Sequence, residues 1–307
     1  MTDTESHSSS DTMESVPCDL CGADDFDVYL PPRRMRPLAD SDFTVLGEQG
    51  EHPQIVRCRH CGLIYANPRD TQASLVQKYQ AMPIKEYLLE EQTRRMTARR
   101  DAARLARYVP DGRVLDVGCS AGLFLDAIGK AYDRYGVEPG AESARLAEEL
   151  IGEGRIHNGP LESAELPERS FDAVTLWDVI EHMTSPRAAL QRIAALLKDD
   201  GCLMLMTPDI GSGFARILGH RWPHLIRSHI YYFTRPTLRR MLESCGFRVV
   251  RWRTYWRQFT LRYLLERVGL LRPRLSDAAA RPRGLMGITV PVNFFDACLV
   301  VARKSHT

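Results

Sequence analysis

The segment 113–122, Arg-Val-Leu-Asp-Val-Gly-Cys-Ser-Ala-Gly, constrains the fold more than any other part of this chain. Its apolar residues predict a buried strand over Val114–Val117, which carries Asp116 near its end. A turn with Gly118 and Gly122 follows, and an apolar-periodic helix comes next. Glycines let a backbone approach a ligand closely, and a helix N-terminus offers free N–H groups. The segment therefore predicts a strand, a ligand-binding loop and a helix of a parallel α/β sheet.

A second short strand, predicted over Arg134–Val137, ends in an acidic residue. Glu138 is placed there to accept hydrogen bonds from the two hydroxyls of a ribose. The two strand ends together indicate a nucleoside-binding edge of the sheet.

Three ligand classes could use such an edge. A dinucleotide-binding loop requires Gly-x-Gly-x-x-Gly, but this chain has Ser120 at the middle position and Leu123 at the last. Residues 118–122 also match the nucleophile elbow of α/β-hydrolases. That elbow follows several strands and an oxyanion loop, whereas a long helix and a Cys-rich segment come first here.

An acidic residue followed by Gly-x-Gly-x-Gly resembles motif I of the class I S-adenosylmethionine (AdoMet)-dependent methyltransferases, with Ser120 at one glycine position. The resemblance covers residues 71–303. It implies an α/β fold with a Rossmann-like, seven-stranded, mostly parallel sheet whose last strand is antiparallel. Segments 170–174, 177–182 and 229–234 and the pair Gly246-Phe247 match later family landmarks. The resemblance implies these AdoMet-binding residues: Asp116, Gly118, Ser120, Gly122, Glu138 for the ribose, Glu162 for the adenine amino group, and Trp177.

Two Cys-x-x-Cys-Gly knuckles form the second strong signal. They contain Cys18 and Cys21, and Cys58 and Cys61. Each knuckle supplies two thiolates from one tight turn, and four thiolates make a closed tetrahedral site suited to structural Zn²⁺. Disulfides are the alternative. His60 lies inside the second knuckle and is expected to face solvent.

The predicted organisation is a disordered tail over 1–15, a zinc ribbon over 16–70 and the methyltransferase domain over 71–307. A basic and aromatic segment, 251–285, is interpreted as an insertion between the last two strands that packs on the core or on a partner subunit. The alternative is a lid, or a surface for a membrane-borne or anionic acceptor. Further strands are expected at 156–157, 173–177, 203–207, 248–252 and 298–302, and helices over 86–108, from Pro186 to about 199–201, and from Thr234 to about Gly246.

Composition and net charge limit the classes of binding partner that this chain is expected to have. A formal net charge of +2 gives no case for a polyanion binder, so DNA is not expected and RNA is disfavoured. No apolar run approaches the roughly 20 residues of a membrane span, although peripheral membrane contact stays open. The remaining cysteines look unpaired, and no signal peptide is evident, so a cytoplasmic location is predicted.

Two histidines are the candidate catalytic bases. His182 and His229 follow the fourth and fifth strands, where the acceptor of such folds would lie. In zinc-ribbon sugar C-methyltransferases, histidines at these positions face the substrate, but the Tyr and Glu that precede the second one are replaced here by Ile226 and Ser228. In ubiquinone-type O-methyltransferases, the pattern of Asp178, Glu181 and His182 can hold Mg²⁺. A structural role for Glu181-His182 is the third alternative.

The sequence thus predicts an AdoMet-dependent methyltransferase with a structural zinc site. We expect it to methylate an oxygen or carbon of a small-molecule or glycan acceptor. One alternative is an rRNA base methyltransferase, because one such family also has an N-terminal four-cysteine module. The other is a non-catalytic interaction protein that binds AdoMet. The sequence does not define the oligomeric state.

Overall fold

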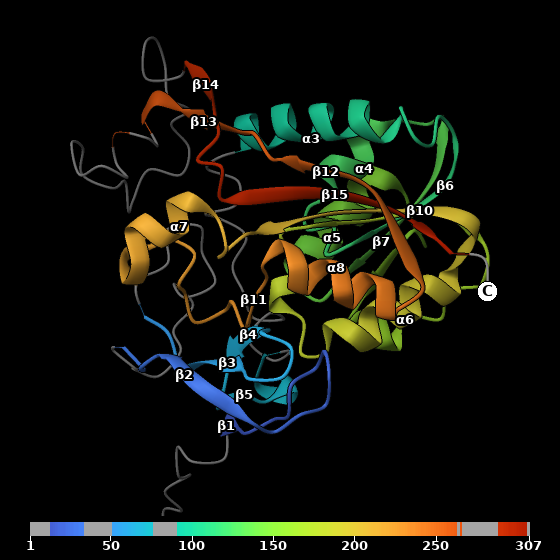
Figure 1. Ribbon diagram of the computed structural model, residues 1–307. Coiled ribbons are helices and arrows are strands. Elements are labelled where there is room, and N and C mark those ends of the chain that lie inside the picture. Colours follow the sequence, from blue (N-terminus) through green and yellow to red (C-terminus); the bar gives the residue numbers. More distant parts are fainter. Residues whose placement is uncertain (1–12, 34–50, 76–90, 263–264, 266–287, 306–307) are drawn as a thin grey trace, which may run out of the picture.

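The computed structural model describes residues 13–33, 51–75, 91–262, 265 and 288–305. A seven-stranded sheet forms its centre (Figure 1), with the order β12-β15-β10-β9-β6-β7-β8. Its strands are β6 (Gly112–Val117), β7 (Tyr132–Glu138), β8 (Ile156–Asn158), β9 (Phe171–Trp177), β10 (Leu197–Pro208), β12 (Phe247–Thr254) and β15 (Ala297–Lys304). Only β15 runs antiparallel to its neighbours. The predicted α/β fold with a mostly parallel seven-stranded sheet is confirmed.

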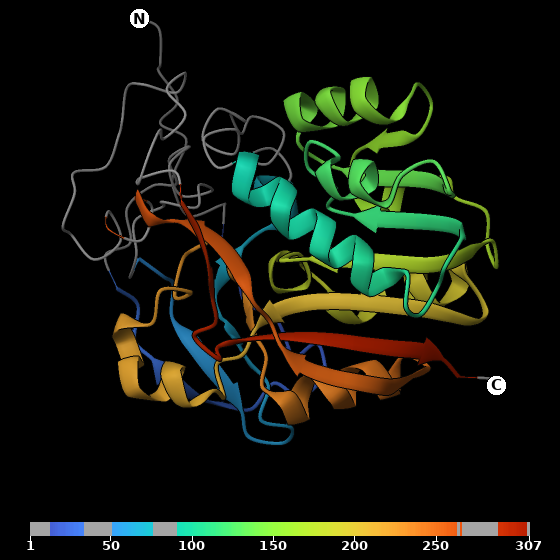
Figure 2. The same ribbon diagram turned by 90° about the horizontal axis from the view of Figure 1, so that it is seen from above.

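Helices cover both faces of this sheet. They are α3 (Glu91–Leu105), α4 (Leu123–Ile128), α5 (Ala141–Ile151), α6 (Pro186–Leu196), α7 (Gly213–Leu218) and α8 (Arg235–Ser244). Alternate strand residues point to opposite faces, so Val114 packs in a core with α3, α4 and α5, while Leu115 packs in a core with α6 and α8. Figure 2 shows α3 lying over the sheet. Ala98, Leu105 and Val109, on this helix and just after it, are buried in the core that contains Val114.

Two helix starts follow the sequence signals closely. Ser185 caps α6 by accepting a hydrogen bond from the Ala188 N–H, with Pro186 in the first turn. Thr234 and Thr237 form a capping box at the start of α8. The predicted end of α6 at residues 199–201 is wrong. The helix ends at Leu196, because β10 begins at once and pairs with β9 through an irregular register before residue 202.

The cysteine-rich segment forms a small sheet of its own below the central sheet (Figure 1). Its strands are β2 (Phe26–Leu30), β3 (Ile55–Cys58) and β4 (Ile64–Ala66), and β11 (Tyr231–Tyr232) joins it as the fourth strand. Residues 16–70 are called the ribbon below. Most of its buried apolar residues belong to the same core as Leu115 and α8, while Ile55 and Ile64 pack with Trp222 and Tyr232. The ribbon is therefore packed as part of one molecule, with a strand contributed from residues that follow β10.

The expected disordered tail does not include Met13 and Glu14. These residues form β1 (Met13–Glu14), which pairs with β5 (Arg69–Asp70). The Glu14 carboxylate also lies 3.1 Å from Nε of Arg69, and Val16 exchanges hydrogen bonds with the Asn67 side chain. These contacts hold residues 13–16 against residues 67–70. Residues 1–12 and 86–90 lie outside the described residues.

The basic and aromatic segment begins inside β12 and continues into β13 (Arg257–Thr260), which pairs with β14 (Thr289–Val292). The described part packs on the core: the Tyr255 hydroxyl donates to Asp101 on α3 over 2.6 Å. Residues 263–264 and 266–287 lie outside the described residues. Within the described part of the chain, no helix is both long and apolar enough to cross a membrane.

Candidate active site and metal centre

The loop after β6 and the end of β7 meet at one carboxylate. One oxygen of Glu138 accepts a hydrogen bond from the Ser120 N–H at 2.8 Å, and the other accepts from the Gly140 N–H at 2.7 Å. Burial raises the pKa of Glu138, and these two N–H groups oppose that rise. The carboxylate is therefore held in a fixed orientation at the carboxyl edge of the sheet.

The loop itself has left-handed backbone at several positions. Ser120 has φ of 47°, a conformation that favours glycine, and this is the position where the family pattern has glycine. Gly122 has φ of 75°, and a Cβ there would lie 3.2 Å from the Ala147 Cα on α5. Gly122 thus permits close packing of two helices, and the approach to a ligand expected from the sequence stays a prediction.

Asp116 lies beneath this loop. It is 2% exposed and accepts a hydrogen bond from the Thr175 hydroxyl at 2.6 Å. Burial raises the pKa of Asp116 to about 8, and the Glu138 carboxylate adds to the rise. The partner Thr175 sits opposite Asp116 on β9, a pairing that sequence reasoning did not find because it depends on strand register.

Two further predicted cofactor residues, Glu162 and Trp177, follow β8 and end β9. Glu162 is exposed on a short 3₁₀ helix, Leu161–Ser163, which follows β8. Gly159, just before it, donates its N–H to the Glu138 carbonyl, so this segment runs beside the end of β7. Trp177 ends β9, and its buried Nε1 has no hydrogen-bond partner among the described residues. It packs against Phe124, with ring centroids 5.2 Å apart.

The structure brings the two predicted catalytic histidines together. The imidazole rings of His182 and His229 meet edge to face with centroids 4.6 Å apart. Nδ1 of His182 lies 2.8 Å from the Ser228 carbonyl oxygen, which leaves its Nε2 as the other donor or acceptor. Burial lowers the pKa of both histidines, and the neighbouring His182 and His224 lower that of His229 further. Both imidazoles are therefore neutral near pH 7.

Glu181 lies beside these rings. It is 1% exposed, and its Oε2 accepts from the Thr207 hydroxyl at 3.0 Å, while its Oε1 has no partner among the described residues. Potential ligand atoms of Glu181, His182 and His229 all lie within 4.8 Å of one another. Two imidazoles and one carboxylate form a donor set suited to a divalent metal.

Asp178 does not belong to this cluster. Its carboxylate pairs instead with Nη2 of Arg257 at 2.6 Å. The magnesium site considered from sequence, which used Asp178 as a ligand, is therefore corrected: His229 takes the third place. Arg257 comes from β13 in the basic segment, and no local sequence pattern predicts this pairing.

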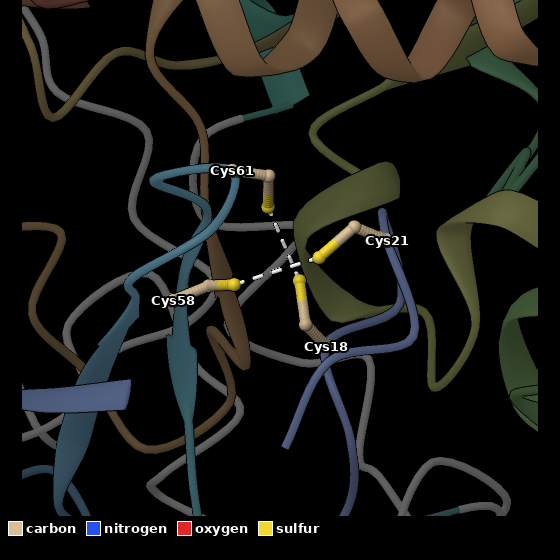
Figure 3. Close-up of side chains that lie close together, drawn as sticks. All are labelled: Cys18, Cys21, Cys58 and Cys61. Carbon is tan, nitrogen blue, oxygen red and sulfur yellow. Dashed lines mark hydrogen bonds between the residues drawn. The ribbon is translucent and has the colours of Figure 1, made fainter. Parts of the chain in front are cut away.

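Figure 3 shows the four cysteines of the two knuckles pointing toward one another. The Sγ atoms of Cys18 and Cys61 are 3.3 Å apart, and those of Cys21 and Cys58 are 3.5 Å apart. These distances are longer than a disulfide bond, and all four cysteines are free thiols. Their Sγ atoms all lie within 4.8 Å of one another. The residues fit a closed four-thiolate metal site.

The sheet order and the helices on both faces define a Rossmann-like α/β fold. A family model described as "Methyltransferase domain" matches residues 88–252, more than half of the chain. The chain belongs to this methyltransferase family, and the predicted resemblance to class I AdoMet-dependent methyltransferases is confirmed.

Curated relatives agree on this class. Ubiquinone biosynthesis O-methyltransferase of Xanthomonas campestris pv. campestris (strain B100) is 40% identical over 121 residues, covering 34% of this chain and 46% of the relative. tRNA U34 carboxymethyltransferase of Aeromonas salmonicida (strain A449) is 31% identical over 146 residues, covering 45% of each chain. The chain thus spans less than half the length of these relatives.

Solved structures also match. A crystal structure of a SAM-dependent methyltransferase from Archaeoglobus fulgidus aligns with a TM-score of 0.48 and 22% identity, covering 71% of this chain and 99% of that chain.

Proposed function

We propose that this protein transfers a methyl group from AdoMet to an oxygen or carbon of a small-molecule or glycan acceptor. The observation that supports the proposal is that two groups of residues follow parallel strands at the same edge of the sheet. Glu138 ends β7, and His182 follows β9 and lies beside His229. A cytoplasmic location, predicted from sequence, is part of the proposal.

The residues present fit AdoMet. Glu138, whose orientation two backbone N–H groups fix, is proposed to accept the two ribose hydroxyls, and the exposed Glu162 is proposed to bind the adenine amino group. The other cofactor residues proposed are Asp116, Gly118, Ser120, Gly122 and Trp177. When bound, AdoMet supplies a methyl group that the positive charge of its sulfur already activates. The protein's task is then to align the acceptor and to remove its proton.

His182 and His229 are proposed to take that proton. Nδ1 of His182 is engaged by the Ser228 carbonyl, so Nε2 is the nitrogen that can accept. Burial keeps both rings neutral, as a base must be. The acceptor oxygen or carbon would lie between this pair and the cofactor half-site.

Transfer of label from methyl-labelled AdoMet into a fractionated cell extract tests the acceptor class. We expect label in small metabolites or lipid-linked glycans, since the chain is nearly neutral in charge. The curated relatives include both a ubiquinone biosynthesis enzyme and a tRNA enzyme. Label that appears only in RNA would contradict the proposal and support the rRNA alternative.

The four cysteines are proposed to hold one structural Zn²⁺. Metal analysis of protein purified without added zinc should give about one equivalent per chain, because four converging thiolates form a closed site. Cys58→Ser should lose the metal and open residues 16–70 to protease. His60→Ala is the matched control, since that exposed side chain lies in the same knuckle and should leave the zinc in place. Zinc retained by Cys58→Ser would contradict the ligand set.

A second role for the histidine pair is metal binding. The buried, unpartnered Oε1 of Glu181 favours it. If a divalent metal acts there, a mild chelator should abolish turnover while the ribbon zinc stays bound, and Glu181→Gln should reproduce the loss. Full turnover by protein in which metal analysis finds only the ribbon zinc would exclude this role and leave the base role.

A further inference from the structure

The first knuckle of the ribbon caps the helix that follows His182. Asp19 stands between the ligands Cys18 and Cys21, and its two carboxylate oxygens accept from the Ser185 hydroxyl and the Arg187 backbone N–H, each at 2.8 Å. An acidic group at a helix N-terminus satisfies free N–H groups and interacts favourably with the helix dipole. The knuckle thereby fixes the end of the loop over residues 178–185, called the His182 loop.

The last strand of the ribbon reaches the same loop. The guanidinium of Arg69 donates from Nη1 to the Thr184 carbonyl oxygen and to the Tyr231 hydroxyl oxygen, the latter at 3.0 Å. The Tyr231 hydroxyl itself donates to the Thr184 carbonyl. Arg69 is thus a bridge between the His182 loop and β11.

The ribbon also holds the loop that carries His229, residues 222–230. Asp70 forms a two-point ion pair with Arg227, with N–O distances of 2.9 and 3.1 Å, and the side chains are 3% and 10% exposed. A buried two-point pair fixes direction as well as distance. The Ala66 N–H donates to the Ile230 carbonyl at 2.8 Å, and β11 then pairs with β4.

The two loops are joined to each other as well. The Ile230 N–H donates to the Glu181 carbonyl at 3.0 Å, and His182 contacts the Ser228 carbonyl. The contacts that hold Glu138, the proposed cofactor residue, are different. Its carboxylate accepts from the backbone N–H groups of Ser120 and Gly140, which follow β6 and β7 of the central sheet. Contacts from the ribbon therefore reach both histidine loops, whereas the contacts that hold the Glu138 carboxylate come from outside the ribbon.

We propose that the ribbon is the positioning element of the acceptor half of the site, with Asp19, Arg69 and Asp70 as its positioning residues. Metal binding by the four thiolates fixes the position of the first knuckle and of the ribbon strands. Asp19, Arg69 and Asp70 lie on these elements and contact both histidine loops. The inference rests on the proposed function for its catalytic meaning, but the coupling itself is a property of the folded chain.

Asp70→Asn and Asp19→Asn test the coupling, because each removes a charge with little change in size. Asp27→Asn is the matched control: it breaks an exposed ion pair with Arg59 in the same ribbon, 2.6 Å long, that contacts neither loop. Each variant is made as the full chain and compared for zinc content, AdoMet affinity and the imidazole resonances of His182 and His229. Nitrogen-15-labelled histidine provides those resonances, and His→Gln variants assign them.

We expect Asp70→Asn and Asp19→Asn to keep their zinc, to bind AdoMet within twofold of wild type, and to shift the resonances of His182 and His229. With the acceptor, kcat should fall about tenfold or more, since small displacements of catalytic groups are costly. Asp27→Asn should match wild type in every measurement. If Asp70→Asn does not fold or Asp19→Asn loses zinc, Tyr231→Phe, which removes only the hydroxyl that Arg69 contacts, carries the test.

Imidazole resonances and kcat equal to wild type in the test variants would overturn the proposal. So would shifts of equal size in Asp27→Asn. Failure of the wild-type chain to bind AdoMet would instead refute the proposed function, and the histidine resonances would still report whether the ribbon positions the two loops.

Discussion

Replacing His229 or His182 with alanine is expected to lower methyl transfer by about 100-fold or more, the scale of a lost general base, while AdoMet affinity stays within about threefold. The reason is their location. Both rings lie on loops after β9 and β10 with centroids 4.6 Å apart, and His182 contacts the Ser228 carbonyl on the loop that carries His229. Turnover and AdoMet binding measured on the same preparations check this expectation.

His220→Ala is the matched control for these variants. His220 is an exposed histidine in the same stretch after α7, and its backbone carbonyl accepts a hydrogen bond from the Arg33 guanidinium. It should retain wild-type turnover. Full activity of both His182→Ala and His229→Ala would refute the base role and assign a structural role to the Glu-His pair.

Replacing Glu138 with alanine is expected to weaken AdoMet binding by roughly 2–3 kcal/mol, about 30- to 150-fold in Kd, because a charged acceptor of two hydrogen bonds is lost. The structure adds a second cause. The same carboxylate holds the Ser120 and Gly140 N–H groups, so its removal also loosens the loop after β6.

Calorimetric titration measures this effect, with Glu153→Ala as the control for removing a carboxylate. Glu153 is exposed after α5, and its loss should leave the affinity unchanged. Wild-type affinity in Glu138→Ala would show that Glu138 does not hold the cofactor.

The fold could be predicted because its signals are local. Strand–loop–helix punctuation around Asp116 and the capping residues Ser185 and Thr234 each depend on a few neighbouring residues. The resemblance to class I methyltransferases then supplied the antiparallel last strand, which periodicity alone does not show. The convergence of the four cysteines followed from knuckle spacing.

The remaining features depend on contacts between distant segments. The pairing of Arg257 with Asp178 spans 79 positions, and that of Arg227 with Asp70 spans 157. Neither has a spacing rule. For the same reason, the prediction from sequence included Asp178 in the candidate metal site and described the ribbon as a separate domain. Strand β11 joins the two parts, and a strand of two residues carries too little periodicity to be recognised.

Titration of the wild-type chain with AdoMet and, separately, with NAD is the most direct test of the central claim, because it needs no knowledge of the acceptor. The claim is that the loop after β6 and Glu138 form the cofactor site of an AdoMet-dependent methyltransferase. Binding of AdoMet with one site per chain, tighter than that of NAD, is the predicted result. Tighter binding of NAD, or no binding of AdoMet to folded protein, would contradict it.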